Sequence, residues 1–394
     1  MNGKRRIASA MRHEEPDRVP VMCQLALGHY FLNTRFAPHE IWFTSEAFAE
    51  ALVELQRRYR FDGILINIPG RPQGLLDEAK SIRETDEGEE LTWVNGDVTL
   101  IPWDDNAQHY QADGSMARRA DFDTLDPEHL DSIDDLAGYV WNTYHVPWVT
   151  DKPTRGPMTQ VPDYFFHTFD LVKGMVGEEV SVHGEVFSPF THYLELFGYE
   201  EALMGLIKDS GKAHALLERL AQASITWGVA QTKHDADAVL ISSAFAGGGF
   251  VSPKMYREFV VPYERKVAEA IKAAGGTVYT HTCGHLGDRL EAMLETGTMG
   301  IDTLDPPPLG NTTLEEAKSL IGDKVFLKGN MNGVEILAFK TEGEVIDHAT
   351  ERVRVGMPGS GYILSTACSV PPKVEPWKLE LLAPLAEEIG QYDG

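Results

Sequence analysis

The stretch Gly276-Thr277-Val278-Tyr279-Thr280-His281-Thr282-Cys283-Gly284 indicates both the fold and the chemistry of this chain. Residues 277–283 form a short β-rich apolar run, typical of a buried strand, and the run ends in a histidine and a cysteine. Side chains two positions apart in a strand point to the same side, with α-carbons about 6.5 Å apart. A rigid strand can therefore direct His281 and Cys283 toward one metal ion.

Seven further apolar runs that end in polar or glycine residues predict seven further strands. A helical pattern separates most neighbouring pairs of runs. Eight strands that alternate with helices are typical of a (βα)8 TIM barrel, so we expect an α/β fold of this class. The seven runs cover residues 19–24, 63–67, 181–186, 238–243, 300–305, 325–330 and 361–368.

The helix starts between these runs carry capping signals. Ser252-Pro253 predicts an N-cap followed by proline at the first helical position, which would open an amphipathic helix. Thr312 with Glu315, and Thr341 with Glu344, have the spacing of a capping box. These signals support the predicted boundaries between strands and helices.

Length and composition are compatible with one barrel that carries an insertion. The 394 residues would suffice for two average domains, but also for one barrel-sized domain with an added segment. Residues 69–156 lie between the second and third predicted strands and contain a predicted hairpin, 91–94 with 98–103, around Asn95-Gly96. We therefore expect a single TIM-barrel domain over residues 1–394, with 69–156 as an insertion that shapes the barrel mouth.

The charge balance excludes several partner classes. The chain has 60 acidic and 35 basic residues, a net charge of −25, which repels phosphate backbones and anionic lipid surfaces. No apolar run is long enough to span a bilayer, and no apolar core follows the basic N-terminal residues as in a signal peptide. We expect a soluble, cytoplasmic protein that acts on a small molecule or a protein. Three cysteines argue against a disulfide framework.

A third soft donor, Cys368, closes the last predicted strand. Active sites of TIM barrels lie at the carboxyl ends of the strands, so Cys368 is expected on the same face as His281 and Cys283. Two thiolates and an imidazole suit Zn2+ and leave a fourth position open for a reactant. Such a site binds a thiol as thiolate or polarises an ether or alcohol oxygen, whereas hydrolytic zinc sites more often use histidine and carboxylate ligands.

Residues near other strand ends are candidate catalytic and substrate-binding groups. Glu185, the candidate catalytic residue, could be a fourth zinc ligand, a proton donor to a leaving oxygen or a base for a substrate hydroxyl, or it could form a salt bridge at the barrel rim. Asp302 and Asp305 could orient substrate, pair with a buried arginine or cap a helix. Aromatic rings at strand ends would suit a flat aromatic substrate, although such rings also pack loops onto a barrel. The candidate substrate-binding residues are His29, Tyr30, Phe187, Phe245, Asp305 and Asn330.

Longer motifs carry a family resemblance over nearly the whole chain. The motifs are Pro16-Asp17-Arg18-Val19-Pro20-Val21, Gly184-Glu185-Val186-Phe187-Ser188-Pro189-Phe190, Ser252-Pro253-Lys254-Met255-Tyr256-Arg257-Glu258-Phe259, His281-Thr282-Cys283-Gly284, Lys328-Gly329-Asn330 and Gly361-Tyr362-Ile363-Leu364-Ser365-Thr366-Ala367-Cys368. In these motifs the sequence resembles the uroporphyrinogen decarboxylase superfamily, and within it the zinc- and corrinoid-dependent methyltransferases. The resemblance implies a TIM barrel and carries the role of zinc ligand onto His281, Cys283 and Cys368.

The chain departs from the decarboxylases of this superfamily in two stretches. Those enzymes carry Arg-Gln-Ala-Gly-Arg-Tyr, which binds substrate carboxylates, whereas this chain has Met22-Cys23-Gln24-Leu25-Ala26-Leu27-Gly28-His29-Tyr30, without either arginine. A tetrapyrrole rich in carboxylates needs cationic partners, so porphyrinogen decarboxylation is disfavoured. Ser242-Ser243-Ala244-Phe245 also stands where relatives often place an aspartate.

The resemblance implies a methyltransferase in which zinc coordinates a heteroatom while a methyl group passes between that atom and the cobalt of a corrinoid. The chain has no cobalamin-binding Asp-x-His-x-x-Gly motif, so the corrinoid would be supplied by a partner protein. An aromatic pocket without a basic cluster favours O-demethylation of a methoxylated aromatic compound. The alternatives are methyl transfer to a thiol of the coenzyme M type, a metal-independent decarboxylase of a smaller acid, and a zinc-stabilised binding protein without activity. The direction of transfer and a homodimeric state stay open.

Overall fold

The computed structural model describes residues 1–116, 119–130 and 161–392. Seven parallel strands form one sheet in the order β1-β6-β7-β8-β9-β10-β11. Each strand falls on a predicted run, and the α/β barrel class is confirmed. The strands are β1 (Gly63–Ile66), β6 (Ser181–Phe187), β7 (Ala238–Ser242), β8 (Val278–Thr282), β9 (Gly300–Thr303), β10 (Phe326–Met331) and β11 (Tyr362–Thr366).

The predicted first strand, residues 19–24, is not a regular strand, and in this respect the prediction was wrong. The segment makes an isolated parallel bridge from Val21 to Leu364 of β11, and the Leu364 amide donates to the Pro20 carbonyl at 2.9 Å. On its other side, the Asp62 amide donates to the Val21 carbonyl at 2.7 Å. Pro20 has no N–H, and the Val21 amide is bound by the Asp62 carboxylate at 2.8 Å, so a regular ladder does not form. The segment nevertheless closes the barrel between β11 and β1.

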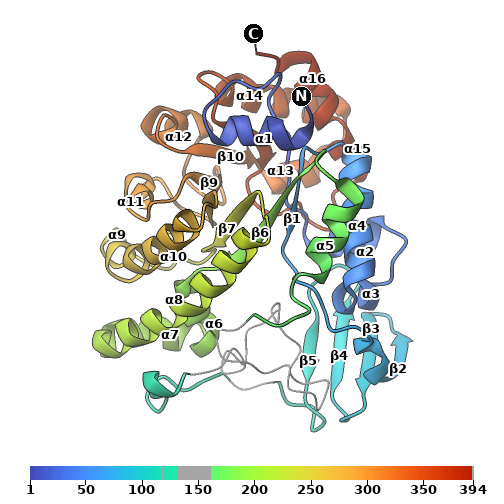
Figure 1. Ribbon diagram of the computed structural model, residues 1–394, viewed down its shortest axis with the longest axis vertical. Coiled ribbons are helices and arrows are strands. Elements are labelled where there is room, and N and C mark those ends of the chain that lie inside the picture. Colours follow the sequence, from blue (N-terminus) through green and yellow to red (C-terminus); the bar gives the residue numbers. More distant parts are fainter. Residues whose placement is uncertain (117–118, 131–160, 393–394) are drawn as a thin grey trace.

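Helices surround the sheet (Figure 1), and α8 packs against both β6 and α10. The described residues also contain the helical turns η1 (Leu75–Glu78), η2 (Pro127–His129) and the π-helical η4 (Tyr256–Val260). The α-helices are α1 (Gly3–Met11), α2 (Leu27–Asn33), α3 (Pro38–Phe43), α4 (Ser45–Tyr59), α5 (His167–Val176), α6 (Pro189–Phe197), α7 (Tyr199–Lys208), α8 (Ser210–Lys233), α9 (Pro253–Met255), α10 (Val261–Ala273), α11 (Leu290–Leu294), α12 (Leu314–Ile321), α13 (Gly333–Ala338), α14 (Glu342–Gly356), α15 (Pro376–Glu380) and α16 (Leu382–Ile389).

The predicted helix caps are confirmed with one shift. Ser252 caps α9, and Thr341 forms the predicted capping box at the start of α14. The box assigned to Thr312 was wrong by one residue, because Thr313 is the N-cap of α12 and its hydroxyl accepts from the Glu316 amide at 3.2 Å. Both threonines have a glutamate three positions later, but Thr312 is only 1% exposed. Spacing alone could not distinguish the two.

A second sheet follows β1 in the chain. It is antiparallel, in the order β2-β3-β4-β5, and β3 and β4 form the predicted hairpin around Asn95-Gly96. Figure 1 shows this sheet at the end of the molecule opposite α1 and α16. Residues 117–118 and 131–156 of the predicted insertion lie outside the described residues, so its role at the mouth and the single-domain organisation stay predictions. The strands are β2 (Ala79–Glu84), β3 (Gly88–Trp93), β4 (Val98–Pro102) and β5 (Gln108–Tyr110).

The filling of the barrel differs between its two ends. A buried apolar cluster joins residues of α1 to side chains from the strands, so α1 lies over the amino ends of the strands. Buried polar groups, among them Glu185, Asp302 and Lys328, lie farther along the strands. None of the described helices is long and apolar enough to cross a membrane. The apolar cluster consists of Ile7, Ala10, Met11, Met22, Leu65, Ala238, Leu240, Tyr279, Phe326 and Ile363.

Candidate metal centre

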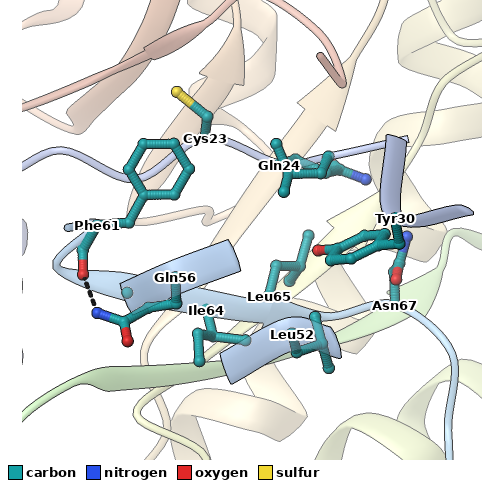
Figure 2. Close-up of a pocket in the computed structure, with 11 residues that line it drawn as sticks. Cys23, Gln24, Tyr30, Leu52, Gln56, Phe61, Ile64, Leu65 and Asn67 are labelled. Atoms are coloured by element: carbon teal, nitrogen blue, oxygen red, sulfur yellow. Dashed lines mark hydrogen bonds between the residues drawn. The ribbon is translucent and has the colours of Figure 1, made fainter. Parts of the chain in front are cut away.

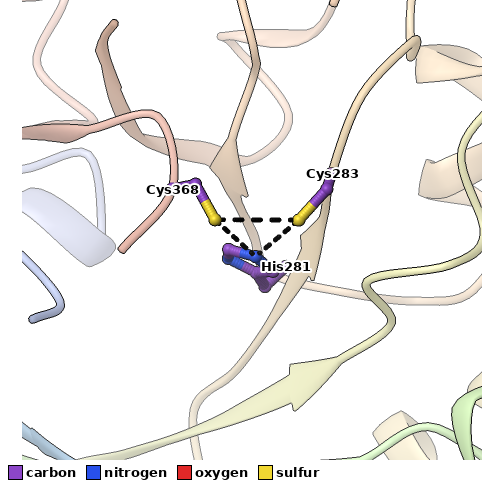
Figure 3. A group of neighbouring side chains, drawn as sticks. All are labelled: His281, Cys283 and Cys368. Atoms are coloured by element: carbon purple, nitrogen blue, oxygen red, sulfur yellow. Dashed lines mark hydrogen bonds between the residues drawn. The ribbon is translucent and has the colours of Figure 1, made fainter. Parts of the chain in front are cut away.

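Three soft donors converge at the carboxyl ends of two strands. His281 lies near the end of β8, Cys283 directly follows β8, and Cys368 follows β11. The His281 Nε2 atom is 3.2 Å from the Cys283 sulfur and 3.9 Å from the Cys368 sulfur, and the two sulfur atoms are 3.8 Å apart (Figure 3). The structure therefore brings together the three predicted ligands.

These distances fit a tetrahedral zinc site. With Zn–S of about 2.3 Å and Zn–N of about 2.0–2.1 Å, tetrahedral angles place two sulfurs about 3.8 Å apart and a nitrogen about 3.6 Å from each sulfur. The observed separations of 3.8 Å for the sulfurs, and of 3.2 and 3.9 Å for the nitrogen, bracket those values. Within the described part of the chain, this is the group of metal-binding side chains whose donor atoms lie within 4.8 Å of one another. The residues present fit a three-ligand zinc site.

Proton positions around the three donors are interdependent. Burial lowers the pKa of His281, but its hydrogen bonds with Asp302 and Cys368 outweigh burial and raise that pKa to about 10. The hydrogen bond with Cys283, together with His281, lowers the pKa of Cys368 well below its usual value despite burial, and the same contact, with burial, raises the pKa of Cys283. Without a metal ion, an imidazolium and a thiolate stabilise each other. A divalent ion bound by these three donors would displace the protons and release them.

The other ring nitrogen of His281 is held from β9. Its Nδ1 atom lies 3.0 Å from Asp302 Oδ2 and 2.7 Å from Thr303 Oγ1. Consecutive strand residues normally point to opposite sides, but Thr303 has a φ of 94°, which is rare for a β-branched residue, at the point where both side chains reach the ring. Asp302 is in turn bound by Lys328 of β10, whose Nζ donates to Oδ1 at 2.8 Å. Asp302 thus contacts a side chain of the candidate donor set.

Glu185 lies near the end of β6 and is 9% exposed. Burial raises its pKa to about 7, partly opposed by a hydrogen bond with Ser242 and by the charge of His281. Among the described residues Glu185 forms no ion pair, so the salt bridge considered as an alternative is not found there, and Glu185 is not part of the donor cluster. A carboxylic acid with such a pKa can donate a proton near neutral pH.

The two polar candidates for substrate binding contact the protein backbone. Asp305 Oδ2 accepts from the Gly284 amide at 2.7 Å and so fixes the loop that carries Cys283. Asn330 donates through Nδ2 to the Leu304 carbonyl at 2.9 Å, and its buried Oδ1 has no hydrogen-bond partner in the described structure. Asp305 therefore supports the donor loop, while Asn330 keeps an unused acceptor. Their contacts with substrate stay predictions.

His29 and Tyr30 lie in the core beside α4. His29 is fully buried, with Nε2 at 2.7 Å from the Tyr59 hydroxyl and Nδ1 at 3.1 Å from the Pro372 carbonyl. Burial lowers its pKa to about 4, so the ring is neutral near pH 7. The Tyr30 ring is 5% exposed and packs edge-on against Phe48, with centroids 5.7 Å apart. Both ring nitrogens of His29 have protein contacts, and its role toward substrate stays a prediction.

The aromatic candidates belong to two different environments. Phe187 is 3% exposed at the end of β6 and packs against His192. Phe245 is half-buried and forms a three-ring cluster with Tyr199 and Phe250, whose ring centroids lie 5.0 and 5.4 Å from its own. Phe245 and Phe250 follow β7 and Tyr199 begins α7, and together the three rings offer aromatic surface. The substrate roles of Phe187 and Phe245 stay predictions.

A small cavity with room for about one water molecule lies between residues 18–25, β1 and α4 (Figure 2). Gln24 Oε1 and Asn67 Oδ1 are buried there without a hydrogen-bond partner among the described residues. The Gln24 carbonyl accepts from the Val370 amide at 2.8 Å, and Val370 follows Cys368 closely. The cavity wall is therefore tied to the loop that carries the candidate donor Cys368. Its lining residues are Cys23, Gln24, Leu25, Tyr30, Leu52, Gln56, Phe61, Gly63, Ile64, Leu65 and Asn67.

Two residues around His281 were not predicted to take part in the site, Lys328 and Thr303. A signal for Lys328 exists in the sequence, because a lysine in the middle of a buried strand needs a buried anionic partner. Thr303 carries no such signal, since threonine is common in strands.

Comparison with known proteins places these residues in a family. Residues 151–389 match the family described as Uroporphyrinogen decarboxylase (URO-D). Methylcobamide:CoM methyltransferase MtaA of Methanosarcina barkeri is 23% identical over 202 residues, which cover 51% of this chain and 56% of the relative. Uroporphyrinogen decarboxylase of Serratia proteamaculans (strain 568) is 27% identical over 228 residues, which cover 54% and 60%. The chain thus spans a little over half of the length of these curated relatives.

A solved structure described as a methyltransferase from Methanosarcina mazei superimposes with a TM-score of 0.70. The superposition covers 98% of this chain and 99% of that chain at 16% sequence identity, so it shows a shared fold. The family match includes Glu185 and the three soft donors, whereas residues 18–25 precede it. The resemblance to this superfamily is confirmed.

Proposed function

The chain belongs to the uroporphyrinogen decarboxylase family, and from this we propose that it is a zinc-dependent methyltransferase. It would move a methyl group between a heteroatom of a small molecule and the cobalt of a corrinoid held by a partner protein. The observation that carries the proposal is the convergence of His281, Cys283 and Cys368, with donor atoms 3.2 to 3.9 Å apart. The relative named Methylcobamide:CoM methyltransferase MtaA supports this branch of the family.

The donor set suits activation of a heteroatom. When bound, zinc would supply a Lewis acid that polarises this atom at a fourth coordination position. Cys283 and Cys368 contribute two negative charges as thiolates and His281 contributes none, so these side chains balance the charge of a divalent ion. Such a neutral centre favours thiols and ethers over hydrolysis of strong bonds by activated water.

Glu185 is the proposed proton donor to a departing oxygen. Its pKa of about 7 lets it hold a proton near neutral pH and give that proton up when a more basic oxygen forms nearby. An alkyl ether is a poor electrophile, so protonation of the leaving oxygen would assist removal of its methyl group. Glu185 would thus act on the substrate side of the reaction.

A methoxylated aromatic compound is the proposed methyl donor, which makes the reaction an O-demethylation. The cluster of the half-buried Phe245 with the exposed Tyr199 and Phe250 offers rings against which a flat substrate could pack. Lys328 is paired with Asp302 and is not free to bind an anionic group, which favours an uncharged ring over a sulfonate.

Methyl transfer to a thiol is the second candidate. Two cysteine ligands favour a thiolate as the next ligand, and the relative MtaA is named for methyl transfer involving CoM. A metal-independent decarboxylase is the third, because several relatives carry that name. The three candidates differ in zinc content and in the compounds that react.

The test combines metal analysis with a substrate panel. Purified protein is analysed for zinc and incubated with a corrinoid protein in the Co(I) state and with methoxyaromatics, thiols or methylamines, while the cobalt absorption spectrum is followed. We expect about one zinc per chain and a spectral change with methoxyaromatics that chelator-treated protein does not give. A response in the thiol arm alone would support the second candidate, and full activity on a small acid without zinc would refute the proposal.

A further inference from the structure

Three buried residues on adjacent strands form a row behind the metal ligands. In the strand register His281 of β8 lies opposite Asp302 of β9, and Asp302 lies opposite Lys328 of β10. The three residues are 5%, 2% and 2% exposed. Asp302 uses one carboxylate oxygen for His281 Nδ1 at 3.0 Å and the other for Lys328 Nζ at 2.8 Å. The row is thus continuous from the ammonium group to the imidazole.

The carboxylate selects one form of the imidazole. A carboxylate can only accept hydrogen bonds, so its contact with Nδ1 requires the hydrogen on that nitrogen. In the neutral ring, the form that binds a metal ion, the lone pair then lies on Nε2, the nitrogen that faces the sulfurs of Cys283 and Cys368 at 3.2 and 3.9 Å. The Thr303 hydroxyl, 2.7 Å from Nδ1, can donate as well as accept, so it does not impose this choice.

Lys328 keeps the Asp302 carboxylate in position to accept a hydrogen bond from His281 Nδ1. The ammonium group of Lys328 supplies the opposite charge and fixes one oxygen, so that the other stays directed at His281. The lysine therefore acts on the metal ligand through the aspartate.

We propose that Asp302 and Lys328 are positioning residues that hold His281 as its Nδ1–H tautomer, with Nε2 pre-formed as a zinc ligand. The inference rests on the proposed function in so far as zinc is the ion. It assigns Lys328, which does not touch the metal donors, a role in metal affinity. Outer hydrogen-bond partners of metal ligands typically contribute about 10–100-fold to affinity.

Zinc affinity of the full-length protein, measured by competition with a chromophoric chelator, tests the proposal. Asp302→Asn should weaken zinc binding by about 10–100-fold, because the amide can donate to Nδ1 and so favour the tautomer that cannot bind metal through Nε2. Lys328→Met should weaken it in the same range, and Lys328→Arg, which keeps the charge, should restore affinity to within about threefold. Wild-type affinity in Asp302→Asn would overturn the proposal.

Matched variants separate positioning from general destabilisation. Glu89→Gln changes a buried carboxylate of β3 in the second sheet, which accepts from the His39 amide at 2.8 Å, and should leave zinc affinity unchanged. Thr303→Val should change affinity by less than about threefold if the aspartate selects the tautomer. Equal loss in Glu89→Gln and Asp302→Asn would show a nonspecific effect and refute the assignment.

A measurement on the unaltered protein covers the case in which a variant does not fold. Long-range proton–nitrogen NMR of zinc-loaded protein should show His281 protonated at Nδ1 and metal-bound at Nε2, and the reverse assignment would overturn the proposal. Failure of the proposed function is distinct, since a protein that binds zinc through Nε2 but transfers no methyl group would refute the activity and leave the positioning role intact. A wild-type protein without zinc affinity would overturn both.

Discussion

The sulfur atoms of Cys283 and Cys368 lie 3.8 Å apart, although the two residues follow β8 and β11, which are not neighbours in the sheet. Side chains from separated strands meet at this distance only where a curved sheet directs them toward a common axis. The position of each sulfur therefore depends on closure of the barrel, and the separation equals that expected across a tetrahedral zinc ion, about 3.8 Å.

Removal of the donor group of either Cys368 or His281 should abolish metal binding. Cys368→Ala and His281→Ala each leave two protein ligands, and we expect both variants to lose stoichiometric zinc and methyl transfer while circular dichroism still shows a folded barrel. Zinc is measured by mass spectrometry of the purified protein. Cys23→Ala is the matched control, because Cys23 is a buried thiol outside the donor cluster and its loss should leave zinc bound.

Replacement of Glu185 should affect turnover more than binding. Its pKa of about 7 is raised by burial, so the acid form dominates below that pH and is lost as the pH rises through it. If Glu185 donates a proton, kcat of the wild type falls above pH 7, and Glu185→Gln lowers kcat by about 10²–10⁴ and abolishes that pH dependence while KM changes little. An unchanged kcat in Glu185→Gln would leave this residue with a purely structural role.

The regular part of the fold could be predicted because its signals are local. Seven strands lie on short, largely apolar runs that end in polar or glycine residues, and parallel strands buried on both faces have such a pattern. Residues 19–24 show the same pattern, but their backbone partners come from Leu364 and Asp62, far away in the sequence. Periodicity contains no information about the Asp62 side chain, so the irregular closure of the barrel could not be foreseen.

The candidate site likewise contains residues that could be predicted from the sequence and residues that could not. His281, Cys283 and Cys368 could be predicted because soft donors at strand ends are few and chemically distinctive. The residues that orient them are common types: Lys328 and Thr303 gain their roles from strand register and from one unusual φ angle. The buried contacts of His29 with Tyr59 and Pro372 depend equally on tertiary packing, which aromatic composition does not reveal.

A buried carboxyl outside the metal centre should make stability depend on pH. Glu264 of α10 is fully buried, accepts from the Ser243 hydroxyl through Oε1, and has no partner for Oε2 within the described residues. Burial raises its pKa to about 7, partly opposed by the Ser243 hydrogen bond. Because the folded-state pKa is raised, the contribution of Glu264 to stability is fully present below about pH 4.5 and is lost as the pH rises through about 7.

Glu264→Gln should remove this pH dependence. The difference in the free energy of unfolding between the variant and the wild type is measured by urea denaturation at each pH. We expect this difference to shift in favour of the variant by about 3 kcal/mol as the pH rises from 4.5 to 8. Glu258→Gln, at an exposed site on the same helical segment, is the control. Its free energy of unfolding should differ from that of the wild type by the same amount at every pH in this range. A flat difference for Glu264→Gln as well would mean that Glu264 ionises in the folded protein as readily as in the unfolded chain.

Asp62 should be the most sensitive position for closure of the barrel. Its carboxylate is 4% exposed and binds Arg6 Nη1 at 2.5 Å, Arg18 Nη1 at 2.8 Å and the Val21 amide at 2.8 Å. Asp62→Ala would leave two buried guanidinium groups without this partner and release the closing segment from β1, so we expect a loss of about 3–5 kcal/mol in urea denaturation.

The matched control for Asp62→Ala is Asp123→Ala, which removes an exposed partner of Lys208. A solvent-exposed ion pair contributes about 0–1 kcal/mol, so this variant should unfold near the wild-type midpoint. Hydrogen exchange distinguishes the proposed cause from a general loss of packing, because Asp62→Ala should expose first the amides that join the segment to its neighbours, those of Leu364 and Asp62. If hydrogen exchange became faster to the same extent in all strands, Asp62 would stabilise the fold without specifically holding the closing segment.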